Sequence, residues 1–169
     1  MRNSKTARRL LVLGVAALAG ACGGSSGGEP ARDSDAARAG ASAAAGGNVL
    51  VTVYKSPTCG CCTKWVDHIR EAGFKVEVRD TPDVQPVKTG HGLPGHLASC
   101  HTALVGGYVV EGHVPADVIR RLLRERPDVA GIGVPGMPMG SPGMEGSYKD
   151  PYQVIAFGKD GGTSVYESR

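Results

Sequence analysis

The sequence predicts one mixed α/β domain, ordered strand–helix–strand and then strand–strand–helix, with an additional C-terminal hairpin and a loop rich in Gly, Pro and Met. Two observations predict it. Apolar, β-branched runs alternate with segments of helical periodicity, and a Gly–Gly pair separates two of the runs. With only 8 aromatic residues among 169, the chain has side chains for a single compact core.

The first half of the domain is predicted to be a β-α-β unit. Residues 49–54 form an almost continuous apolar run, typical of a strand covered on both faces. Residues 74–79 alternate apolar and charged side chains, as a half-exposed strand does. Between them, Gly73 ends a helix whose inner face carries Cys62, Trp65, Val66, Ile69 and Ala72. A helix joining two adjacent strands predicts that they run parallel.

The second half is predicted to be a hairpin followed by a helix. Residues 102–105 and 108–111 flank Gly106–Gly107, which can adopt the positive φ angles of a tight turn. Pro115 opens the next helix and Pro127 stops it.

The remaining segments are less regular. Residues 81–101 are rich in Pro and Gly, and we expect one or two short helical turns there. Residues 152–157 and 163–166 predict the additional hairpin.

The N-terminus has the pattern of a bacterial export signal. Four cations precede an apolar stretch over residues 10–19, which is too short to span a bilayer. Residues 19–22, Ala-Gly-Ala-Cys, resemble a lipobox, so residues 1–21 are predicted to be a lipoprotein signal peptide and Cys22 to be lipidated. An ordinary signal peptide cut near Ala21 is the alternative. Either signal places the protein outside the cytoplasm, and lipidation would hold it at the periplasmic side of the envelope.

The next segment is predicted to be a tether. Of the 25 residues from 23 to 47, 19 are Gly, Ala or Ser. Such small side chains bury too little apolar surface to offset the loss of chain entropy on folding. The folded domain is then 48–169. Once the signal is removed, 15 basic residues face 16 acidic ones, which argues against nucleic-acid binding and leaves the lipid as the sole membrane contact.

Three cysteines stand at the start of the first helix, as Cys59-Gly60-Cys61-Cys62. The element order resembles the thioredoxin and glutaredoxin fold, which keeps a dithiol at this place. A helix N-terminus favours the thiolate form of Cys59, the nucleophile-like position. Cys100 precedes the hairpin, opposite the dithiol, and Ala103 stands where that fold has a cis-proline.

Four clustered sulfurs favour a metal site over a simple redox pair. Thiolates about 4 Å apart repel by about 4 kcal/mol per pair at an effective dielectric of about 20. Protonation, a disulfide or a cation must relieve that repulsion, and soft cations suit thiolates best. A purely redox Cys59–Cys62 pair would leave two spare thiols in an oxidising compartment.

The methionines lie together in a loop. Met137, Met139 and Met144 fall in residues 133–145, where frequent Gly and Pro disfavour helix and strand. Thioether sulfur is a soft ligand that selects Cu(I). The alternative is that these side chains only fill gaps over the core.

Two histidines are candidates for the same site. His101 follows Cys100 and is expected to be a ligand, a ligand's partner or a structural histidine. His113 is expected either to cap the last helix or to join the site. His68 is expected on the exposed face of its helix.

Four segments together are similar to the CopG-type copper-resistance family, a small thioredoxin-like, metal-binding family of the bacterial envelope: residues 59–62, 99–102, 112–115 and 134–145. The resemblance implies periplasmic handling of copper or silver, with thiolates gathering Cu(I), a sulfur-bridged multinuclear cluster being one arrangement. The ligands implied are Cys59, Cys61, Cys62 and Cys100, with His101, His113, Met137, Met139 and Met144 as further candidates.

Three hypotheses follow. The first is a lipid-anchored protein, not an enzyme in the usual sense, that sequesters Cu(I) or passes it to other periplasmic copper-handling proteins. The second is a thiol-disulfide oxidoreductase in which Cys59 attacks and Cys62 resolves. The third is a structural Zn site of thiolates and His101.

Overall fold

A computed structural model describes residues 48–169 of the chain. The predicted signal peptide, Cys22 and the tether over 23–47 lie outside the described residues. None of the helices in the described part is long and apolar enough to cross a bilayer.

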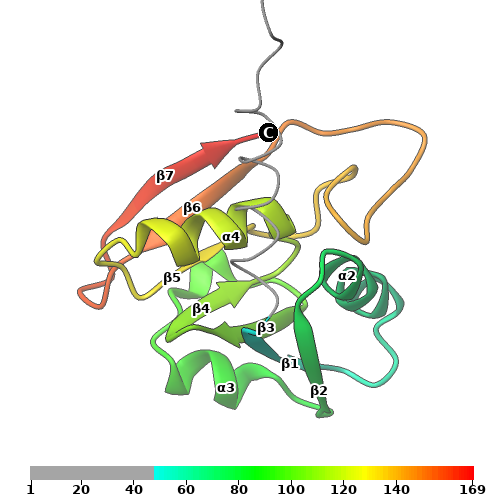
Figure 1. Cartoon of the computed structure of the whole chain (residues 1–169), viewed down its shortest axis with the longest axis horizontal. Helices are drawn as coiled ribbons and strands as arrows, with labels where there is room; N and C mark the ends of the chain where they lie inside the picture. The colour runs from blue at the N-terminus through cyan, green and yellow to red at the C-terminus, as the bar shows by residue number, and fades with distance from the viewer. Residues whose placement is uncertain (1–47) are drawn as a thin grey trace, which may run out of the picture. The chain divides into compact units, whose positions relative to one another are not determined.

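A seven-stranded sheet organises the domain, in the order β2-β1-β3-β4-β5-β6-β7 (Figure 1). The strands are β1 (Leu50–Lys55), β2 (Lys75–Asp80), β3 (His101–Val105), β4 (Tyr108–Glu111), β5 (Gly131–Gly133), β6 (Gln153–Phe157) and β7 (Thr163–Ser168). The helices are α2 (Gly60–Glu71), α3 (Gln85–Gly90), the 3-10 turn η1 (Gly95–Leu97) and α4 (Ala116–Glu125).

The predicted order of elements is confirmed. β1 and β2 run parallel through α2, and β3 pairs with both β1 and β4 in antiparallel register. Gly106 and Gly107 have φ of 58° and 91°, which suits the tight turn between β3 and β4. Two short turns, α3 and η1, occupy the segment predicted to hold them. That the central strands follow thioredoxin topology stays a prediction.

One strand was not predicted from the sequence. β5 has the sequence Gly-Ile-Gly and lies between β4 and β6, parallel to the first and antiparallel to the second. Glycine is normally depleted in strands, so the sequence alone does not indicate one here. The structure explains Gly131, because a Cβ atom there would clash with the Val109 carbonyl oxygen. β5 joins the C-terminal hairpin to the rest of the sheet.

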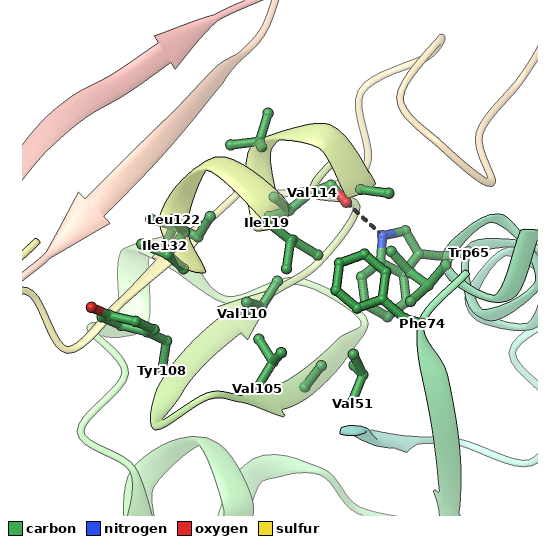
Figure 2. Packing of buried hydrophobic residues seen from close by; sticks show 14 of the residues in the cluster. Val51, Trp65, Phe74, Val105, Tyr108, Val110, Val114, Ile119, Leu122 and Ile132 are labelled. Atoms are coloured by element: carbon green, nitrogen blue, oxygen red, sulfur yellow. Dashed lines mark hydrogen bonds between the residues drawn. The ribbon is translucent and has the colours of Figure 1, made fainter. Parts of the chain in front are cut away.

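The core lies mainly between the sheet and helices α2 and α4 (Figure 2). Side chains of β1, β3 and β4 face this layer, while Leu93, Leu97, Val109 and Phe157 form a smaller cluster. Trp65 is fully buried, and its Nε1–H donates a hydrogen bond of 2.9 Å to the Val114 carbonyl oxygen. This bond ties α2 to the segment entering α4, so the two helices hold the segments that carry the cysteines and His113.

Candidate metal centre

The first half of the site is the N-terminal end of α2. A turn at Ser56 leads into the helix, where the Cys59 N–H donates to the Ser56 carbonyl oxygen at 3.1 Å. Cys59 is the N-cap residue, and its side chain makes no capping bond. The sulfur atoms of Cys59 and Cys61 are 3.5 Å apart, and Cys62, one turn on, is buried. Three sulfur atoms are thus presented by one helical turn.

Two of these cysteines form a disulfide, Cys59–Cys62. Among the described residues, Cys61 and Cys100 are free. The four sulfur atoms all lie within 4.8 Å of one another, which confirms the predicted proximity of Cys100 to the helix. The arrangement therefore offers a disulfide and two thiols when oxidised, and four clustered thiols after a two-electron reduction.

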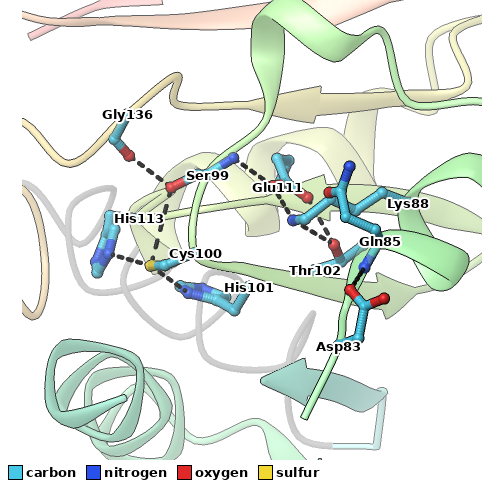
Figure 3. Close-up of polar contacts among 10 residues, drawn as sticks. All are labelled: Asp83, Gln85, Lys88, Ser99, Cys100, His101, Thr102, Glu111, His113 and Gly136. Carbon is cyan, nitrogen blue, oxygen red and sulfur yellow. Dashed lines mark hydrogen bonds and ion pairs between the residues drawn. The ribbon is translucent and has the colours of Figure 1, made fainter. Parts of the chain in front are cut away.

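The second half of the site is the start of β3. Cys100 immediately precedes this strand, and its Sγ lies 3.0 Å from His113 Nε2 and 3.4 Å from His101 Nδ1 (Figure 3). Burial raises the pKa of the Cys100 thiol to about 11, and the charge of Cys61 acts in the same direction. In the absence of a cation, Cys100 is therefore a protonated thiol near neutral pH.

His113 belongs to this site and does not cap α4. Its Nδ1 lies 2.8 Å from the Pro142 carbonyl oxygen, which can only accept, so Nδ1 carries the proton. Nε2 then directs its lone pair at Cys100. Burial lowers the pKa of His113, which favours the neutral ring that metal coordination needs. A backbone carbonyl that orients a histidine in this way is a common support for metal-ligating rings.

His101 is completely buried beneath the cysteines. Its ring centroid lies 4.4 Å from that of Trp65 and 5.1 Å from that of His113, with the two histidine rings in a T-shaped arrangement. Burial holds its pKa well below the usual value, and the nearby charges of His113 and Lys88 add to that effect. Its Nε2 has no hydrogen-bond partner among the described residues. Cys100, His101 and His113 form a second set whose ligand atoms all lie within 4.8 Å.

The cap of α4 comes from a different histidine. His68 Nε2 accepts the Ala116 N–H at 3.1 Å, so the prediction that His68 is an exposed residue is wrong. The ring is half-buried, because α2 packs close to the start of α4. Burial lowers the pKa of His68, consistent with its role as an acceptor.

The methionine loop connects β5 to β6 and packs against the N-terminal half of α2. A Cβ atom on Gly143 would lie 2.6 Å from the Cys61 carbonyl oxygen and 2.9 Å from the Trp65 nitrogen. Met137 is 51% exposed, and Met139 and Met144 are half-buried. A Cβ atom at Gly146 would meet the methyl carbon of Met139, which packs within its own loop. That the three thioethers bind metal stays a prediction.

A buried ion pair lies behind Cys100 and was not predicted from the sequence. Lys88 of α3 and Glu111 of β4 are 5% and 0% exposed and form an ion pair (Figure 3). Nothing in the sequence indicates that Lys88 is buried, because its segment was expected only to contain turns. Glu111 gives a weak indication of burial, since it is the sole acid in an apolar hairpin strand.

Comparisons with known proteins agree with this geometry. No curated protein matches the chain. Residues 97–144 match the family described as "Protein of unknown function, DUF411". Two solved structures described as "Copper resistance protein copG" are similar, Form 2 with 44% identity and Form 1 with 45%. Form 2 has a TM-score of 0.68, with 72% of this chain and 98% of that chain covered. Form 1 has a TM-score of 0.67, with 71% and 96% covered. With this identity over nearly the whole of both structures, the chain belongs to the DUF411 family and is a homologue of the copper resistance protein CopG.

Proposed function

We propose that the protein binds Cu(I) in the bacterial periplasm and sequesters it or transfers it to other copper-handling proteins. One observation carries the proposal: four cysteine sulfurs from two distant segments lie within 4.8 Å of one another. Soft thiolate ligands favour Cu(I), and the similarity to copper resistance proteins supports copper as the metal.

The chemistry requires the reduced form. Opening the Cys59–Cys62 disulfide takes two electrons and gives four thiols. Copper binding then displaces their protons, because the thiolate is the form that coordinates metal. Several Cu(I) ions bridged by shared sulfurs would offset the repulsion among four closely spaced thiolates. His113 Nε2, already directed at Cys100, and the methionine loop supply further soft or borderline ligands.

A titration with Cu(I) tests the proposal. Full-length protein, reduced and kept anaerobic, is titrated against a chromophoric Cu(I) chelator. We expect uptake of several equivalents per chain and loss of that uptake in Cys59→Ser/Cys62→Ser/Cys100→Ser. The matched control is Cys22→Ser, which removes a cysteine outside the site and should not change uptake. Normal uptake by the triple variant would end the proposal. A single Zn(II) equivalent in place of Cu(I) would instead favour a zinc site of thiolates and His101.

The proposed location follows from the N-terminal sequence. An export signal over residues 1–21, directly before Cys22, supports lipidation of Cys22 and anchoring at the periplasmic side. Metabolic labelling with a radioactive fatty acid should mark the wild type and leave Cys22→Ser unlabelled. Equal labelling of both proteins would remove the anchor from the proposal.

A second function is favoured by the disulfide itself. Cys59 and Cys62 span a helix N-terminus in the manner of a redox dithiol, so a thiol-disulfide oxidoreductase is the alternative. It predicts insulin reduction by metal-free protein in the presence of a dithiol, with no change in Cys100→Ser. Absence of turnover in the metal-free wild type would dismiss it.

A further inference from the structure

The buried ion pair between Lys88 and Glu111 lies directly behind the candidate metal centre. The Lys88 ammonium also donates to Thr102 Oγ1 at 3.0 Å, and the Thr102 hydroxyl donates to Glu111 Oε2 at 2.7 Å. All three side chains are within the protein interior. A buried ion pair is weak evidence for stability, since apolar residues of similar volume commonly do as well. Its position therefore calls for another explanation.

The pair is connected to the backbone on both sides of Cys100 and His101. Glu111 Oε1 accepts the Ser99 N–H at 2.6 Å, so the carboxylate holds the residue just before Cys100. Thr102, the residue just after His101, is held through its hydroxyl. Figure 3 shows Glu111 between Ser99 and Thr102, with Cys100 and His101 on the intervening segment.

Ser99 has little freedom to move from this position. Its hydroxyl donates to the Gly136 carbonyl oxygen at the start of the methionine loop. Gly112 lies so close that a Cβ atom there would be 2.6 Å from Ser99 Oγ. The next residue along is His113, so the same contacts set the spacing between Cys100 and His113.

We propose that Glu111, held in place by Lys88, is a positioning residue that fixes Ser99 and thereby keeps the Cys100 sulfur within reach of the cysteines on α2. The expected effect of this positioning on Cu(I) binding rests on the proposed function. Lys88 supplies the ammonium that pairs with Glu111 and orients its side chain inside the domain, and Glu111 supplies the acceptor for Ser99.

Two double variants of the full chain separate positioning from stability. Lys88→Met/Glu111→Gln removes both charges and keeps a carbonyl acceptor for the Ser99 N–H. Lys88→Met/Glu111→Leu removes the charges and the acceptor together. We expect both to fold, with similar circular dichroism and urea midpoints. The Gln variant should bind Cu(I) within about threefold of the wild type, whereas the Leu variant should bind at least tenfold more weakly.

A second measurement needs no metal. Diamide accepts two electrons and two protons when two neighbouring thiols close to a disulfide. With Cys59–Cys62 oxidised, we expect diamide to join Cys61 to Cys100 in the wild type and the Gln variant, and at least tenfold more slowly in the Leu variant, as measured by peptide mapping. Equal rates and equal copper affinities in the two variants would overturn the proposal.

The positioning role can be tested even if the proposed copper binding fails. If the wild type takes up no Cu(I), the proposed function fails, and the diamide rates still decide the positioning role. If the Leu variant does not fold, Lys88→Met/Glu111→Met takes its place, because methionine is close to glutamine in shape and lacks the acceptor for the Ser99 N–H. It should slow diamide closure relative to the Gln variant, and an equal rate would overturn the proposal.

Discussion

The two sides of the thiol site are built in different ways. On α2, three cysteines are neighbours in the chain, and a single turn of helix sets their spacing. On the β3 side, Cys100 meets His113 across 13 residues, and His113 meets Pro142 across 29. The first half depends on local backbone geometry, whereas the second depends on the packing of the whole domain. Substitutions that disturb packing far from the site should therefore change the position of Cys100 more than the positions of the three cysteines on α2.

The two sides also differ in their electrostatics. The first turn of α2 contains no acidic residue, so no carboxylate in that turn offsets the positive end of the helix beside the cysteines. The β3 side is surrounded by neutral histidines and a paired Lys88–Glu111, and its thiol stays protonated. On α2, Cys59 and Cys62 are joined in a disulfide, whereas on the β3 side the thiol of Cys100 stays protonated until a cation is bound.

The largest effect is expected where the two sides meet. Trp65 of α2 packs on His101 and bonds to the segment entering α4, so Trp65→Ala should remove about 3–5 kcal/mol from the free energy of unfolding. Urea denaturation measures the loss. Trp65→Phe is the control: it keeps most of the ring and should lose less. Similar stability of the wild type and Trp65→Ala would show that the two sides are not joined through this residue.

A smaller effect should come from the loop that covers the helix end. Gly143 has φ of 85°, and a Cβ atom there would lie 2.6 Å from the Cys61 carbonyl oxygen, so Gly143→Ala should cost about 2 kcal/mol. Gly136→Ala is the matched control, because φ is 67° there and a Cβ atom would meet nothing within 4 Å. Thermal unfolding of both variants separates steric contact from backbone strain. Equal losses would mean that the loop does not press on α2.

The contact between α2 and α4 offers a more local test. His68→Ala removes the acceptor for the Ala116 N–H and should cost about 1 kcal/mol, whereas His68→Gln should retain part of that bond. Burial lowers the pKa of His68 in the folded protein, so folding favours the neutral ring. The stabilisation is therefore present above pH 6.5 and is lost as pH falls through the folded pKa. Unfolding measured from pH 8 to 5 should show this loss in the wild type and not in His68→Ala.

At neutral pH, the smallest effect on stability should come from the ionisation of Cys100, which begins only above pH 9.0. Its pKa rises from 9.0 to about 11 in the folded protein, so folding favours the protonated thiol. Stability from this group is complete below pH 9.0 and falls as pH rises to about 11. Alkylation of Cys100 should accelerate over the same range, as followed by mass spectrometry. The variant Cys100→Ala should lack this part of the pH dependence, and a plateau in the alkylation of Cys100 below pH 9 would contradict the prediction.

The local half of the site could be predicted from the sequence. Cysteine spacing at a helix start is visible directly, and the hairpin turn at Gly106–Gly107 places Cys100 at the leading edge of a strand. The proximity of all four sulfurs followed from the order of elements, and the structure confirms it.

The supporting half could not be predicted, because its signals depend on tertiary contacts. Lys88 is buried although lysine is usually exposed, and only the position of α3 on the sheet explains why. His68 was expected to be exposed and instead accepts the Ala116 N–H, and for His113 the sequence left open whether it caps the last helix or joins the site, since a histidine's partners come from elements distant in sequence. β5 was missed because its glycines serve close backbone approach, which local preference does not reveal.

The short strand β5 determines which sheet edges are open to pairing with another chain. By pairing with β4, it leaves every strand of the site hydrogen-bonded on both sides. The unpaired sheet edges in the described part of the chain belong to β2 and β7, where free backbone groups are open to recruitment by another chain. Edge-to-edge association would thus leave β3 and β4 inside each sheet, and aggregation through strands would not begin at the cysteine-bearing hairpin.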